Sequence, residues 1–242
     1  MLQQTQTSRV ERLLPAFLAR FPNFTALAGA TLAEVLIQWQ GFGYNRRAKY
    51  LQAAAQTIHE TFADNLPADQ AILTSLPGIG PNTAASILAY AYNLPTVFVE
   101  TNIRTVFIYH FFDDWTEPVP EPAIRTLVAD SLDHQQSREW YWALMDYGVH
   151  LKQTVGNLNR RAKAYGKQSA FQGSLRQARG AIIRALSAQP HAPAAAELAK
   201  QLVELDDSRY QTALASLVKE GLVVAEAGGL YLAGQQRLKK TQ

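Results

Sequence analysis

Cysteine is absent from this chain of 242 residues. Its absence excludes disulfides, zinc sites with thiolate ligands and cysteine-held iron–sulfur clusters, and it is typical of proteins of a reducing cytoplasm. The five histidines show no metal-ligand spacing, so we expect no metal and no other cofactor. No apolar run approaches the length of a membrane span, and the first residues lack the pattern of a signal peptide, so we expect no membrane partner.

Acidic residues are missing from one stretch of the chain. Residues 152–184 contain eight lysines and arginines and neither aspartate nor glutamate, although the net charge of the whole chain is only +3. The rest of the chain therefore carries a net charge of −5. Such a basic block is typical either of a solvated linker or of a surface that binds a polyanion, and a phosphate-binding motif elsewhere in the chain favours the second.

That motif is the segment 76–83, Leu-Pro-Gly-Ile-Gly-Pro-Asn-Thr, which has the pattern of the turn in a helix-hairpin-helix. Two glycines allow a turn that side chains would obstruct, and Pro81 suits the first turn of the helix that follows. The unpaired amides at the start of that helix form a site for a phosphate. The motif predicts a protein that binds a nucleic-acid backbone without reading bases, through Gly78, Gly80, Asn82 and Thr83.

Apolar residues recur at helical spacing through most of the chain, which predicts a mainly α fold. We expect three domains or segments: a helical domain over 1–151, a basic linker over 152–174 and a small domain over 175–234. The small domain has helices predicted at 175–187, 194–203 and 208–220, then two short strands around Gly228 and Gly229. This is the outline of a winged helix, for which a protein-docking module is the alternative interpretation.

Five blocks, at 1–6, 40–48, 76–80, 99–102 and 144–148, resemble those of the adenine-specific mismatch DNA glycosylases. These enzymes belong to the helix-hairpin-helix superfamily together with endonuclease III. The resemblance implies two helical lobes and a base-excision repair enzyme that hydrolyses the N-glycosidic bond of a flipped adenine opposite 8-oxoguanine or guanine. It also implies double-stranded DNA with a mismatch or an oxidised base as partner. We expect a monomer that works in the cytoplasm, at the nucleoid.

The resemblance also assigns DNA contacts. Gln4 and Tyr44 lie where the family inserts side chains into the gap left by the flipped base, the alternatives being a polar residue on an ordinary helix and a core tyrosine. The remaining predicted contacts are basic residues that would meet the phosphate backbone, namely Arg46, Arg47, Arg160, Arg161 and Lys163.

Glu100 stands where the family has its essential aspartate, and a carboxylate there stabilises positive charge on the sugar. The alternative is a carboxylate that merely satisfies a helix N-terminus. Asn102 matches a family asparagine that helps to orient the site. Asn82 stands where the endonuclease III-like lyases have a lysine, and since an amide cannot form a Schiff base, we expect a monofunctional glycosylase.

The chain departs from the family in three places. The glutamate that acts as general acid would lie two residues ahead of Met1, so we expect a truncated or misassigned start, the alternative being an inactive enzyme. Lys152 stands near the first of four cluster-binding cysteines. The winged-helix-like domain replaces the domain that reads oxoguanine. Two other functions stay open: an endonuclease III-like glycosylase for damaged pyrimidines, which Asn82 disfavours, and a catalytically silent DNA-binding protein.

Overall fold

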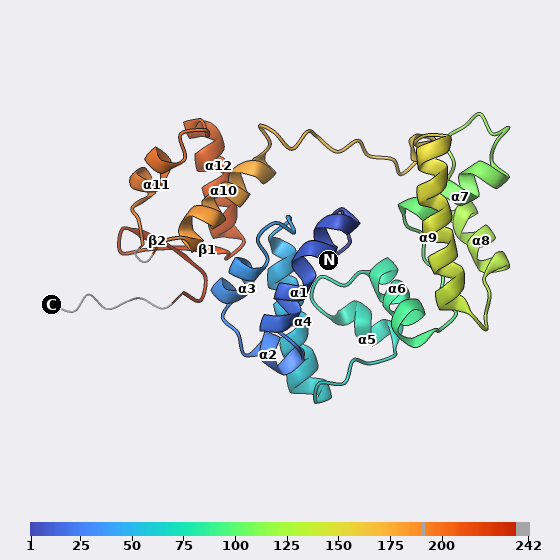
Figure 1. The fold of residues 1–242 in the computed structure, drawn as a ribbon, viewed down its shortest axis with the longest axis horizontal. Helices are drawn as coiled ribbons and strands as arrows, with labels where there is room; N and C mark the ends of the chain where they lie inside the picture. Colours follow the sequence, from blue (N-terminus) through green and yellow to red (C-terminus); the bar gives the residue numbers. More distant parts are fainter. Residues whose placement is uncertain (190–191, 236–242) are drawn as a thin grey trace. The chain divides into compact units, whose positions relative to one another are not determined.

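The computed structural model describes residues 1–189 and 192–235, and in them the chain is mainly helical, which confirms the predicted fold class (Figure 1). Within these ranges no helix combines the length and the apolar character that a bilayer crossing requires. Contacts divide the chain into two compact units. The first unit joins Met1–Leu66 to Ser169–Gln242, and the second unit is Pro67–Gln168.

The first unit begins with four helices and ends with the C-terminal domain. The four helices are α1 (Thr7–Arg20), α2 (Phe24–Ala28), α3 (Leu32–Gln38) and α4 (Arg46–Phe62). The C-terminal domain consists of α10 (Leu175–Ser187), α11 (Ala195–Gln201), α12 (Asp207–Lys219), β1 (Val223–Glu226) and β2 (Gly229–Leu232). The two strands are antiparallel. Ala227 and Gly228 join them with φ of 48° and 78°, as a two-residue hairpin turn requires, and the winged-helix outline is thus confirmed.

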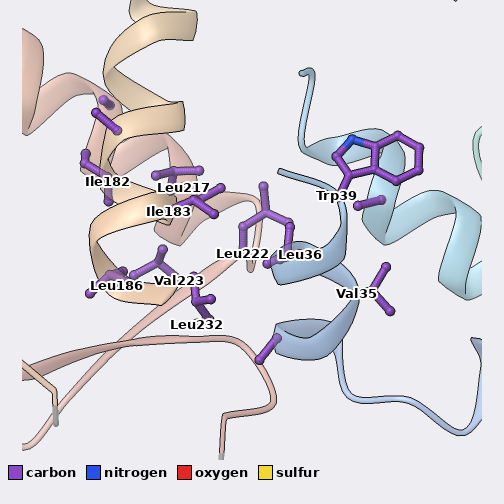
Figure 2. Packing of buried hydrophobic residues seen from close by; sticks show 14 of the residues in the cluster. Val35, Leu36, Trp39, Ile182, Ile183, Leu186, Leu217, Leu222, Val223 and Leu232 are labelled. Carbon is purple, nitrogen blue, oxygen red and sulfur yellow. The ribbon is translucent and has the colours of Figure 1, made fainter. Parts of the chain in front are cut away.

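One hydrophobic core runs through both parts of the first unit. Leu36 and Trp39 of the N-terminal part are 1% and 2% exposed, and they share this core with Leu222, which is fully buried. Figure 2 shows the side chain of Leu222 pointing towards Leu36. At Gly234 a Cβ atom would lie 3.1 Å from the amide nitrogen of Leu32, so the end of the domain also touches the start of α3. The N-terminal helices therefore group with the C-terminal domain, and the units do not coincide with the predicted boundaries at 151 and 174.

The second unit contains the hairpin and the helices that follow it. Its elements are α5 (Gln70–Ser75), α6 (Pro81–Tyr92), α7 (Thr101–Phe111), α8 (Glu121–Ser131), α9 (Ser137–Thr154) and the 3-10 helix η1 (Leu158–Arg161). Their apolar faces form a second core, which includes Phe98, Ile103, Ile124 and Tyr141. In the first unit, the helices predicted at 175–187, 194–203 and 208–220 end within two residues of the observed α10, α11 and α12.

Part of the predicted linker is folded. Its first residues complete α9, and η1 packs against α7. Asn159 is 4% exposed, and its side-chain amide donates to the Thr101 carbonyl oxygen at 3.1 Å and to Thr105 Oγ1 at 2.7 Å. The sequence gives no sign of η1, because side-chain hydrogen bonds rather than periodically spaced apolar residues hold it against α7.

Candidate functional site

The hairpin joins α5 to α6 through a tight turn. Gly78 has φ of 76°, the left-handed conformation that favours glycine, as expected. Gly80 differs from the expectation, because its φ is −90° and a Cβ atom there would meet no heavy atom within 4 Å. No side chain caps the N-terminus of α6, and Pro81 occupies its first turn. The fold thus leaves open space beside a helix N-terminus, where an anion is favoured.

The segment before Glu100 belongs to neither a helix nor a sheet. Its backbone groups bond instead to side chains, as buried peptide groups must. The Tyr141 hydroxyl donates to the Thr96 carbonyl oxygen at 2.8 Å and accepts from the Phe98 amide at 3.3 Å. Burial raises the pKa of Tyr141 to about 12, so the hydroxyl stays protonated and can donate.

Asn82 completes the support of this segment from the start of α6. Its side-chain nitrogen donates to the Val99 carbonyl oxygen at 2.6 Å, and its side-chain oxygen accepts from Arg125 at 3.2 Å. The guanidinium of Arg125 also donates to the Val97 carbonyl oxygen at 3.1 Å. An amide fits this place because it donates and accepts at once, which a lysine cannot do.

Glu100 is the N-cap of α7, and it is half-buried. Its Oε1 accepts from the backbone amides of Asn102 at 2.5 Å and Ile103 at 2.9 Å. Burial raises the pKa of Glu100, while these amide bonds and the charge of Arg104 oppose the rise. The carboxylate therefore does satisfy a helix N-terminus, as one of the two interpretations of the sequence expected. The same bonds also fix its position in a partly water-excluded setting.

A glycine on α9 lets that helix approach the N-terminus of α7. A Cβ atom at Gly148 would lie 2.4 Å from the Asn102 carbonyl oxygen and 2.7 Å from its carbonyl carbon. Both are backbone atoms that cannot move aside, so only glycine fits. The backbone of Asn102 thus contacts both residues: its amide donates to the Glu100 carboxylate, and its carbonyl group packs against Gly148. An orienting role for the Asn102 side chain stays a prediction.

The other group of predicted DNA contacts lies in the first unit. Gln4 and Tyr44 both have left-handed backbones, with φ of 58° and 51°. Residues other than glycine rarely adopt this conformation, and it is found mainly where the surrounding structure imposes it. Neither is an ordinary position in the middle of a helix: Gln4 is exposed and precedes α1, and Tyr44 is half-buried and precedes α4.

Arg47 joins the two segments that carry Gln4 and Tyr44. Its guanidinium donates to four backbone carbonyl oxygens, at distances from 2.5 to 3.1 Å, and to the Thr5 hydroxyl at 2.8 Å. Among the four acceptors are Gln3, next to Gln4, and Gly43, next to Tyr44. Arg47, a predicted phosphate contact, therefore holds both segments in place. Burial lowers the pKa of its guanidinium.

Tyr44 also contacts an arginine of the basic block 152–184 that was not among the predicted DNA contacts. Arg176 of α10 donates to the Tyr44 hydroxyl at 3.0 Å, and its guanidinium carbon lies 5.7 Å from the centre of the ring. The guanidinium carbon of Arg47 lies 5.3 Å from the same ring. Two cations thus face one aromatic ring, an arrangement that stabilises the ring's position.

The three basic residues near η1 are placed differently from one another. Arg160 and Lys163 are exposed. The guanidinium of Arg161 donates to the carbonyl oxygens of Phe112, Asp113 at 3.1 Å and Trp115 at 2.8 Å. Arg161 therefore holds the loop after α7, and its contact with phosphate stays a prediction.

Replacing Gly148 by alanine should weaken the second unit. The added methyl group collides with the Asn102 backbone, and overpacking of this kind costs about 1–3 kcal/mol. Denaturant unfolding of Gly148→Ala measures the loss. Gly180→Ala is the matched control, because a Cβ atom at Gly180 of α10 meets nothing within 4 Å and alanine favours a helix. Equal stabilities for the two variants would contradict the close approach of α7 and α9.

Replacing Arg47 by lysine should also lower the free energy of unfolding. A single ammonium group cannot replace all of these hydrogen bonds, and each hydrogen bond that is lost costs about 0.5–1.5 kcal/mol. Arg46→Lys on the same helix is the control, since Arg46 is exposed. A midpoint of denaturation that is the same for both variants would show that Arg47 does not hold the segments.

Comparison with known proteins agrees with the resemblance seen in the sequence. A family model described as HhH-GPD superfamily base excision DNA repair protein matches residues 1–128. The adenine DNA glycosylase of Mycolicibacterium smegmatis is 31% identical over 258 residues, covering 97% of this chain and 85% of that protein. That of Mycobacterium tuberculosis (strain ATCC 25618 / H37Rv) is 30% identical over 253 residues, covering 96% and 82%.

A solved structure shows the same fold. The thermostable thymine-DNA glycosylase superposes with a TM-score of 0.52 at 19% identity, over 61% of this chain and 69% of that one. At this identity the likeness concerns the fold alone. The family match over more than half of the residues and the two long alignments go further, and they show that the chain belongs to the HhH-GPD superfamily of base excision DNA repair proteins.

Proposed function

We propose that the protein is a monofunctional adenine DNA glycosylase, which hydrolyses the N-glycosidic bond of a flipped adenine opposite 8-oxoguanine or guanine. The observation that carries the proposal is the placement of Glu100 at the N-terminus of α7, in the same unit as the hairpin. The names of the relatives from Mycolicibacterium and Mycobacterium support adenine as the base.

The chemistry requires an anion beside the sugar. As the bond from C1′ to the base breaks, the base leaves with the bonding electrons and positive charge develops on the ring. Both hydrogen bonds from the backbone amides are accepted by Oε1 of Glu100. We therefore expect the other carboxylate oxygen, Oε2, to face the positive charge on the sugar. A fixed carboxylate stabilises the transition state without rearrangement. Water then adds to C1′ and loses a proton, and the departed adenine gains one, which completes the hydrolysis.

Asn82 supports hydrolysis rather than lyase chemistry. An amine is needed to form a Schiff base with the sugar, and here an amide bonds to Val99 and Arg125. Treatment with borohydride during turnover should therefore trap no covalent complex between protein and DNA.

We also propose that the protein works without an iron–sulfur cluster. The residues in the region where the resemblance places the cluster support this. The chain has no cysteine to hold the cluster. The side chains of Asn159 and Arg161 are instead bonded to the backbone of α7 and of the loop that follows it. These donors do not fit an iron–sulfur cluster. We also expect the protein to act as a monomer, in the cytoplasm at the nucleoid.

Glu100→Gln should lower the rate of adenine excision by about a hundredfold or more, since it removes the charge that stabilises the transition state. Single-turnover excision from a duplex with adenine opposite 8-oxoguanine measures this rate, and duplex binding should persist. Because burial raises the pKa of Glu100, the wild-type rate should fall as the pH drops through that raised pKa.

Stability gives an independent check of the same residue. With its pKa raised, the native state holds a proton on Glu100 at pH values where the unfolded state has lost it, so stability falls as the pH rises through that window. At pH 7 the Tm of Glu100→Gln should therefore be no lower than that of the wild type. Glu139→Gln, at an exposed position of α9, is the control for both measurements. Full turnover by Glu100→Gln would place the catalytic carboxylate elsewhere.

Gly80→Ala should weaken duplex binding without destabilising the protein. The fold has room for the methyl group, whereas a phosphate seated on the α6 N-terminus would meet it. Fluorescence anisotropy with an undamaged duplex measures the affinity, and thermal unfolding gives the Tm. Gly78→Ala is the contrasting variant, since its φ of 76° makes alanine strained and should lower the Tm. If Gly80→Ala bound the duplex as tightly as the wild type, no DNA phosphate would be bound at this turn.

A further inference from the structure

A pocket of about 420 Å³ lies within the first unit between α4 and α12. Each of its six lining residues carries a polar or charged group, and they come from α4 and from the C-terminal end of α12: Arg46, Lys49, Tyr50, Ser216, Lys219 and Glu220. The helix-hairpin-helix and Glu100 belong to the second unit. This pocket is therefore a separate feature, which the proposed catalytic chemistry leaves unused.

The negative charge of Glu220, the one acidic residue among the six, is already paired with an arginine outside the pocket lining. Both carboxylate oxygens of Glu220 accept from Arg179 of α10, at 3.0 and 2.5 Å. The side chain of Arg179 is 14% exposed, so solvent screens this pair less than a surface pair. Three further cations, Arg46, Lys49 and Lys219, then surround the pocket and give it a net positive charge.

These cations offer more hydrogen-bond donors than the pocket uses. Lys49 Nζ donates to the Glu220 carbonyl oxygen at 2.6 Å, which offsets the negative end of α12 and leaves two N–H groups. Arg46 donates one N–H to the Tyr50 hydroxyl at 2.7 Å, and its Nε lies 3.8 Å from the Glu220 carboxylate. Lys219 is exposed, and in the described part of the chain its ammonium makes no ion pair.

We propose that this pocket binds a phosphate of the DNA backbone, so that the C-terminal domain helps to hold the duplex. Phosphate oxygens only accept hydrogen bonds, and they are bound most strongly by charged donors such as these. Tyr44, which the resemblance places in the gap of the duplex, precedes Arg46 by two residues, so the pocket begins within about one helical turn of it. The inference rests on the proposed function, because it takes duplex DNA as the partner.

The salt dependence of duplex binding tests the proposal. Each phosphate contact contributes a slope of about −0.9 to the logarithm of the affinity against the logarithm of the salt concentration. With an undamaged duplex between 50 and 200 mM salt, Lys219→Gln should make the slope shallower by about that amount. Lys200→Gln makes the same charge change at an exposed position of α11, and it should leave the slope unchanged.

Acetylation of lysines provides a second measurement. An undamaged duplex should protect Lys219 from acetic anhydride while Lys200 stays reactive, as mass spectrometry of the full chain would show. Equal slopes for the two variants, or protection of Lys219 by inorganic phosphate but not by the duplex, would overturn the inference. If those results came from a wild-type protein that still binds duplex and excises adenine, the proposed function would stand. A wild type that does neither would overturn both.

Discussion

The N-terminus of α7 is fixed by a contact between backbones, and the position of Glu100 depends on it. Gly148 of α9 lies against the Asn102 carbonyl group, where any larger residue would collide. Around this contact, side chains of α6, α8, α9 and η1 bond to the backbone between Thr96 and Thr101. The carboxylate is thus attached to a rigid frame rather than to a flexible loop, as a preorganised site requires.

The environment of Glu100 balances two opposing effects. Burial makes ionisation costly, whereas the two amides at the start of α7 and the charge of Arg104 favour the ionised form. The balance keeps a carboxylate that can carry charge in a place with reduced access to water. A charge beside it is screened less there than at the surface, so its attraction for a cationic sugar is stronger.

The sequence predicted the mainly helical fold, the hairpin, and the three helices and two strands of the C-terminal domain, because these depend on apolar spacing and on glycine and proline at the joints. It could not predict how the segment 96–99 is supported. Tyr141 and Arg125 lie far along the chain from that segment, and nothing in their neighbourhood marks them as partners of backbone carbonyls. Arg47 and Arg161 looked like surface bases for the same reason, since composition counts a charge but not the carbonyl groups around it.

The core shared by the N-terminal helices and the C-terminal domain has a consequence for how such a protein can change over time. Leu36 and Trp39 are covered partly by residues more than a hundred positions later in the chain. A gene that lost its last third would produce helices with an uncovered apolar stripe, which promotes self-association. Recombination could therefore replace the C-terminal domain only with a domain that also has an apolar surface complementary to α3.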